Sequence, residues 1–123
     1  MKRILIVLLS ALLLAGCTGS GKPSDTYREF AALLEKNELE AAYKLVDKQS
    51  RVRIDQRGGV ANLTASAAHI KEHRGVKEIK VTHEEQQGDS ATSTALISFK
   101  DGFSGEVANR FLKEDGKWKL VIN

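Results

Sequence analysis

The chain has 123 residues, a formal net charge of +3 and a single cysteine. This length has room for one modest domain, and a lone cysteine cannot form an internal disulfide. Two of the positive charges, Lys2 and Arg3, stand at the very start, and no basic patch with interleaved aromatic residues follows. Nucleic-acid binding is therefore not expected.

The first residues have the layout of a cleaved export signal. Lys2 and Arg3 precede an apolar run over residues 4–14, and small residues then lead to Cys17. The run has 11 residues, whereas an α-helix needs ~20 to cross a bilayer core. A transmembrane anchor is therefore not expected.

The segment Leu14-Ala15-Gly16-Cys17 resembles the lipobox of bacterial lipoproteins. The resemblance implies that the sulfur of Cys17 carries diacylglycerol, that the chain is cut before it, and that the new amino terminus is acylated. Two or three acyl chains, at ~0.8 kcal/mol per buried methylene, give a permanent anchor. The alternatives are a plain export signal or a buried thiol. Thr18 follows, not the aspartate that tends to retain Gram-negative lipoproteins in the inner membrane, so the resemblance favours the outer membrane.

These features predict three parts: a signal peptide over residues 1–16, a lipidated cysteine with a flexible tether over 17–23, and one domain over 24–123. The tether is small, polar and rich in glycine. Its six residues after Cys17 reach at most ~20 Å at ~3.5 Å per residue. The domain is therefore expected to work close to the membrane, which it meets through the lipid anchor.

Helical periodicity dominates the first half of the domain. Thr26 and Glu29 fit a capping box at the start of a first helix, and Asn37 is expected to end this helix and to cap a short second one. Residues 47–59 predict a connector. Its Val52 and Ile54 are expected to point inward. A third helix is predicted over residues 60–73, with Gly75 as its C-cap.

After residue 75 the apolar period changes from 3.6 to 2, which is typical of strands. Turns are predicted at residues 87–89 and as two-residue hairpins at Asp101-Gly102 and Asp115-Gly116. In the first strand the alternation places His83 inward with Ile79 and Val81. The predicted fold class is α+β, with three N-terminal helices packed on a curved four-stranded antiparallel meander.

This order of elements resembles the nuclear transport factor 2-like superfamily, and within it a family of small bacterial lipoproteins of unknown function. The likeness is carried by three segments, residues 30–46, 88–102 and 113–120. It implies a hollow between helices and sheet in which ligands sit, and it supplies no catalytic residues. Sheets of this superfamily often pair face to face, so the resemblance also allows a homodimer.

Four residues are candidates for lining the hollow: Tyr43, Ser93, Ala95 and Asn109. Ser93 and Ala95 are small for the inward face of the second strand. They either allow a helix to approach the sheet closely or leave a hollow between helix and sheet. Tyr43 is favoured as a core aromatic residue with its hydroxyl at the rim. Asn109 interrupts an apolar row and either bonds across the sheet or lines the hollow.

His69 and His73 belong to an H-x-x-E-H string and lie four residues apart on the third helix, close enough to share a metal. Nothing in the sequence marks a third ligand, so two solvated or half-buried histidines are favoured. No metal site and no cofactor are expected.

An isomerase or cyclase would need a base inside the hollow and a donor for developing oxyanion charge. The polar residues near inward positions form no recognisable acid–base pair: Tyr43, Asp47, His73, His83 and Asn109. The sequence therefore favours a non-enzymatic, lipid-anchored envelope protein that binds a small apolar ligand, a cell-wall fragment or, preferentially, another envelope protein. The alternative is a small isomerase-like or cyclase-like enzyme that uses the hollow.

Overall fold

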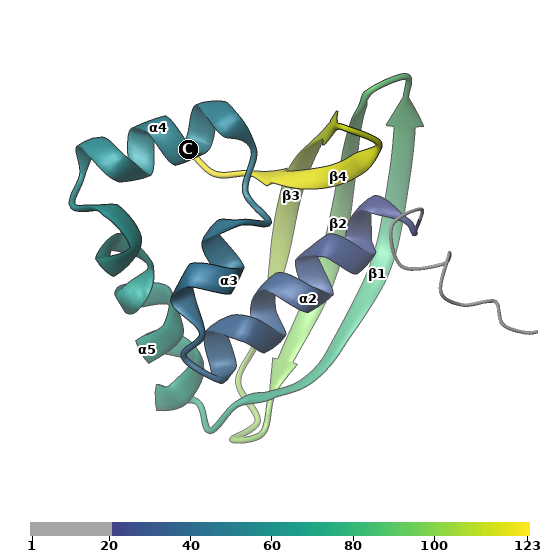
Figure 1. Ribbon diagram of the computed structural model, residues 1–123. Helices are drawn as coiled ribbons and strands as arrows, with labels where there is room; N and C mark the ends of the chain where they lie inside the picture. The colour runs from purple at the N-terminus through teal and green to yellow at the C-terminus, as the bar shows by residue number, and fades with distance from the viewer. Residues whose placement is uncertain (1–20) are drawn as a thin grey trace, which may run out of the picture.

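The computed structural model describes residues 21–123, so the export signal, Cys17 and most of the tether lie outside the described residues. Helices come first and a sheet follows (Figure 1). The helical elements are α2 (Pro23–Glu35), α3 (Leu39–Tyr43), α4 (Lys48–Gln56), the 3-10 helix η2 (Gly59–Leu63) and α5 (Thr64–Glu72). The strands are β1 (Val76–Gln87), β2 (Ser90–Phe99), β3 (Ser104–Glu114) and β4 (Lys117–Val121).

The four strands pair antiparallel in the order β1-β2-β3-β4. This is the predicted meander, and the α+β fold class is confirmed. Figure 1 shows α2 crossing the sheet, with α3, α4 and α5 to one side of it. Within residues 21–123 no helix is long and apolar enough to span a bilayer.

Helix α2 begins four residues earlier than predicted, at Pro23 and not after Thr26. Pro23 occupies its first turn, where the missing N–H and the fixed φ of proline favour a helix start. The N-terminal end is closed by carboxylates: the backbone N–H of Lys22 donates to Asp25 Oδ2 at 3.1 Å, and that of Ser24 donates to Glu84 Oε2 at 2.7 Å. The capping role predicted for Thr26 is therefore wrong.

The end of α2 follows the prediction, but the start of α3 does not. Asn37 adopts a φ of +60°, a left-handed conformation that asparagine tolerates, and the helix ends before it. The N-cap of α3 is Glu38, which makes no capping bond through its side chain. Asn37 therefore ends one helix without capping the next.

The predicted connector over residues 47–59 is mostly the helix α4. Asp47 caps it, because its Oδ2 accepts a hydrogen bond from the backbone N–H of Gln49 at 3.1 Å. Only Ser50 and Ile54 of α4 are buried, which leaves too short an apolar stripe to reveal a helix in sequence. Val52, two positions before Ile54, lies on another side of the helix and is 49% exposed, so its predicted inward position is wrong.

A β-bulge in β1 overturns the inward placement of His83. Val81 pairs with Ala95 and His83 pairs with Thr94, so Thr82 is the extra residue. The extra residue shifts the alternation by one position. The side chain of His83 is consequently 62% exposed, and Glu84 turns toward the N-terminus of α2 instead.

The two Asp-Gly turns differ from each other. Asp115 and Gly116, with φ of +51° and +77°, form the predicted two-residue hairpin, because a type I′ turn needs positive φ at both positions. The turn at Asp101-Gly102 is longer than predicted: residues 100–103 separate β2 from β3, and the backbone N–H of Phe99 bonds the carbonyl of Phe103 at 2.8 Å.

The inward face of β2 packs under helix α2. Ser93 and Ala95 are only 3% and 1% exposed, and α2 contacts β1, β2 and β4. Both small residues are therefore enclosed in the core. The free edge of β4 is covered in turn, because Leu120 exchanges backbone hydrogen bonds with Leu45 and Asp47 at 2.8 and 2.9 Å.

Candidate functional site

A hollow of about 640 Å³ lies between the helices and the sheet. Its wall comes from α2, η2 and α5 on one side and from β2, β3 and the C-terminal segment on the other. Most of the wall is apolar, and its larger members include Phe30, Leu34, Leu63, Ile70, Ile97, Phe99 and Leu120. This volume falls within the ~300–1,000 Å³ typical of small-molecule sites.

The C-terminal side of this wall is held by helix α4. The hydroxyl of Ser50 accepts a hydrogen bond from the backbone N–H of Ile122 at 2.9 Å, and Arg53 Nη2 donates to the carbonyl of Ile122 at 2.9 Å. Figure 1 shows the chain end beside α4. Helix α4, which the sequence did not reveal, thus fixes one side of the hollow.

Asn109 lies on the wall of the hollow, as one of its two sequence-based alternatives predicts. Its Nδ2 is buried and has no hydrogen-bond partner within residues 21–123. A buried donor without a partner costs ~1–3 kcal/mol. Asn109 therefore places an amide with an unused hydrogen-bond donor at the wall of the hollow.

Tyr27 contributes a second polar group to the wall. It lies on α2 and packs against the core. Burial raises the pKa of its hydroxyl, because the charged phenolate is disfavoured away from water. The hydroxyl is therefore neutral at neutral pH, a hydrogen-bond donor and acceptor but not a base.

Three of the four candidate lining residues lie elsewhere. Ser93 and Ala95, both on β2, are buried and do not line the hollow. Tyr43 points its hydroxyl to Asp55 Oδ1 at 2.7 Å, and this hydrogen bond is the main cause that raises the pKa of Tyr43. Asp47 is buried as the cap of α4 and also stands outside the wall.

The rim of the hollow carries a cluster that the sequence showed only in part. His69 from α5 and Phe103 from the β2–β3 loop both line the rim, and their ring centroids are 6.2 Å apart. His73 stacks on Phe103 with centroids at 4.4 Å and an interplanar angle of 14°. His73 Nδ1 lies 2.7 Å from Asp101 Oδ2.

Asp101 was expected only to form a turn, but it also holds this cluster together. Its Oδ1 accepts a hydrogen bond from the backbone N–H of Phe103 at 2.9 Å. That bond and the bond to His73 hold the pKa of Asp101 below its ordinary range. The Asp-Gly turn was the only sign of Asp101 in the sequence. The contact of Asp101 with His73, 28 residues earlier, could not be predicted from sequence spacing.

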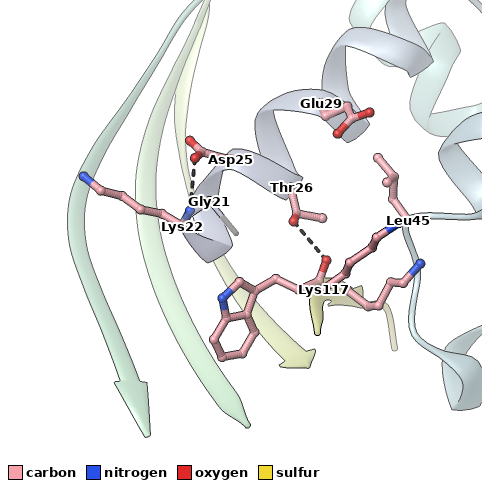
Figure 2. Close-up of a pocket in the computed structure, with 9 residues that line it drawn as sticks. Gly21, Lys22, Asp25, Thr26, Glu29, Leu45 and Lys117 are labelled. Atoms are coloured by element: carbon pink, nitrogen blue, oxygen red, sulfur yellow. Dashed lines mark hydrogen bonds between the residues drawn. The ribbon is translucent and has the colours of Figure 1, made fainter. Parts of the chain in front are cut away.

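A second, much smaller pocket of about 90 Å³ lies at the N-terminal end of α2 (Figure 2). Figure 2 shows Thr26 pointing to strand β4, where its hydroxyl donates to the backbone carbonyl of Trp118 at 3.0 Å. The pocket holds little more than a few water molecules, so its contacts join α2 to β4 and offer no ligand site.

Comparison with known proteins adds three findings. Residues 1–18 match the prokaryotic membrane lipoprotein lipid attachment site. Among curated proteins none matches the chain significantly. Among solved structures, a protein from Campylobacter jejuni named as an NTF2-like transpeptidase superposes with a TM-score of 0.67 at 20% identity, covering 84% of this chain and 100% of that one.

The chain is a small lipoprotein with a nuclear transport factor 2-like fold. A SEC-C motif containing protein from Rhodopseudomonas palustris is also similar, with a TM-score of 0.59 at 15% identity over 88% of this chain and 81% of that one. Identities this low show the fold alone. The lipoprotein is accordingly a lipid-anchored protein of the cell envelope, attached to a membrane through its N-terminus.

Proposed function

We propose that this lipoprotein is a non-enzymatic binding module whose hollow takes a small apolar ligand with a hydrogen-bond acceptor. The observation that carries the proposal is the unpartnered amide of Asn109 on a mostly apolar wall. Apolar sites commonly fix the orientation of a ligand with a few placed polar groups. The neutral hydroxyl of Tyr27 supplies a second such group.

The titratable groups on the wall favour binding over catalysis. Within residues 21–123 they are Tyr27, His69 and Glu106, and the last two are exposed. A general base must lie within reach of the proton it removes, usually sheltered from water. The alternative, an isomerase-like or cyclase-like enzyme, would have to use His69 at the rim as its base, with Tyr27 and Asn109 as donors to an oxyanion.

The anchor determines where this binding would take place. The tether after Cys17 keeps the domain within ~20 Å of the bilayer, and Thr18 after the cysteine favours the periplasmic side of an outer membrane. We infer acylation, palmitate included, at that cysteine. An apolar molecule that leaves or enters the membrane would then meet the hollow at short range.

The test is native mass spectrometry of the lipoprotein released from detergent micelles. We expect an added mass that organic extraction removes and that Gly105→Leu abolishes. Gly105 lies on the wall, and a Cβ placed there would meet no atom within 4 Å, so there is open space beside this position for a larger side chain. The matched control is Ala108→Leu, on the exposed opposite face of β3.

Each outcome of this test separates the candidates. An added mass that survives Gly105→Leu would contradict binding in the hollow. An added mass equal to a second chain would favour a homodimer, and one equal to another protein would favour an envelope partner. An added mass lost in Asn109→Leu as well would show that the amide, and not only the apolar wall, holds the ligand.

A further inference from the structure

We propose that His69, Glu72 and His73 form a transition-metal site at the C-terminal end of α5, suited to Zn²⁺. One ligand atom from each of the three side chains lies within 4.8 Å of the other two. The sequence appeared to lack a third ligand; in the structure Glu72, one turn after His69 and next to His73, supplies it. The proposal is independent of what the hollow binds.

Asp101 prepares His73 for this role. The carboxylate accepts a hydrogen bond from Nδ1 of His73 at 2.7 Å, so Nδ1 carries the proton and Nε2 is the nitrogen available to a metal. Metal-binding histidines almost always donate their other ring N–H in this way, which fixes the tautomer and raises the basicity of the ligand.

Packing holds the two imidazole rings in place. His73 stacks on Phe103 at 4.4 Å, and His69 meets the ring of His73 edge-on at 4.8 Å. The loop that carries Asp101 is also hydrogen-bonded to the end of α5, because the backbone N–H of Asp101 donates to the carbonyl of His73 at 3.3 Å. Two ligands and their supporting carboxylate are thus positioned before a metal arrives.

The donor set selects the class of metal. Two imidazoles and one carboxylate match the three protein ligands of many zinc sites, with a fourth position left for water or another ligand. Ca²⁺ and Mg²⁺ prefer oxygen ligands, and imidazole favours Zn²⁺ and its neighbours in the transition series. Because His69 also lines the rim of the hollow, a metal here would stand at the entrance of the ligand site.

The experiment is isothermal titration of the full lipidated protein in detergent with ZnCl₂. We expect one Zn²⁺ per chain, not displaced by excess Ca²⁺ or Mg²⁺. Asp101→Asn should weaken binding by ~10–100-fold, the usual effect of losing an outer-shell partner. His69→Ala and His73→Ala should each weaken it further, because each removes a ligand. Asparagine keeps an Oδ1 that can accept the Phe103 N–H bond, so the loop should stay folded in that variant.

The matched control is His83→Ala, which removes the third histidine of the chain from an exposed position on β1, outside the cluster. We expect its affinity for Zn²⁺ to equal that of the wild type. Absence of Zn²⁺ binding by the folded protein would overturn the proposal. So would equal losses in His83→Ala and His69→Ala, or displacement by Ca²⁺. Circular dichroism of each variant establishes that it is folded.

Discussion

The hydroxyl of Thr26 in α2 donates a hydrogen bond to the backbone carbonyl of Trp118 in β4 at 3.0 Å. These residues are 92 positions apart, so the bond joins the first helix of the domain to its last strand (Figure 2). The indole of Trp118 is buried in the same region, with Lys113 Nζ 5.3 Å above its ring. This bond is one of the contacts that join the two ends of the domain.

Trp118→Ala should therefore destabilise the domain severely. Truncation of a buried tryptophan costs ~3–5 kcal/mol, out of a total stability of ~5–15 kcal/mol. Urea denaturation followed by circular dichroism measures the loss. Thr26→Val removes only the hydrogen bond and should cost ~1 kcal/mol; a Trp118→Ala variant no less stable than Thr26→Val would contradict the buried position of the indole.

Cys17→Ser should leave the export signal uncut and the protein without acyl chains. The prediction follows from the lipid attachment site at residues 1–18. Mass spectrometry of the membrane fraction checks it, since the wild-type chain should begin at Cys17 and carry the added mass of its lipids. An unmodified wild-type chain that begins at another residue would show that the signal is a plain export signal.

Asp47→Ala should lower the free energy of unfolding by ~1 kcal/mol, within the ~0.5–2 kcal/mol range for loss of an N-cap. The side chain is 1% exposed and caps α4 through Gln49. Asp47→Asn is the control, because asparagine caps a helix equally well. Chemical denaturation compares the two variants, and equal losses in both would argue against the cap as the cause.

The link between Asp101 and His73 predicts a pH dependence at the acid end. The hydrogen bond from Phe103 and then that from His73 lower the pKa of Asp101 below its ordinary value of 3.8. The ionised carboxylate of Asp101 therefore stabilises the folded loop fully above about pH 3.8. This contribution is lost as the pH falls through the lowered pKa of Asp101. An NMR titration of the Asp101 carboxyl should show a midpoint below 3.8.

The same titration contains its own control. The backbone N–H of Phe103 donates to Asp101 Oδ1 at 2.9 Å, so its chemical shift should move with the carboxyl midpoint. In Asp101→Asn that movement should disappear, because no group remains there to titrate. A midpoint at or above 3.8 would mean that these hydrogen bonds do not outweigh the burial that raises the pKa of this carboxyl.

Local features of the sequence were sufficient for much of this fold. The alternation over residues 91–99 predicted the buried face of β2, and Asp115-Gly116 predicted a two-residue hairpin, because each depends only on neighbouring residues. The attachment site at the N-terminus is likewise a contiguous motif. Such features depend on residues that are close together in the sequence, so hydrophobic periodicity and turn preferences are enough to predict them.

The tertiary structure decided the rest. Helix α4 buries only Ser50 and Ile54 and is stabilised by its cap and its contacts. The sequence therefore shows no periodic apolar stripe from which this helix could be predicted. The bulge at Thr82 reversed the side chains beyond it, which sent His83 outward and placed Glu84 at the start of α2. Neither effect is visible in an amphipathic pattern.

The candidate site belongs to this second group. Sequence could single out Asn109 as a polar break in an apolar row, but only the packed structure left its amide without a partner on the wall of the hollow. His73 and Asp101 are 28 residues apart and meet because the β2–β3 loop folds against the end of α5. The sequence by itself determined the anchor, most of the elements and the fold class. Only long-range packing decided which polar groups would meet, because that depends on how separate elements are brought together.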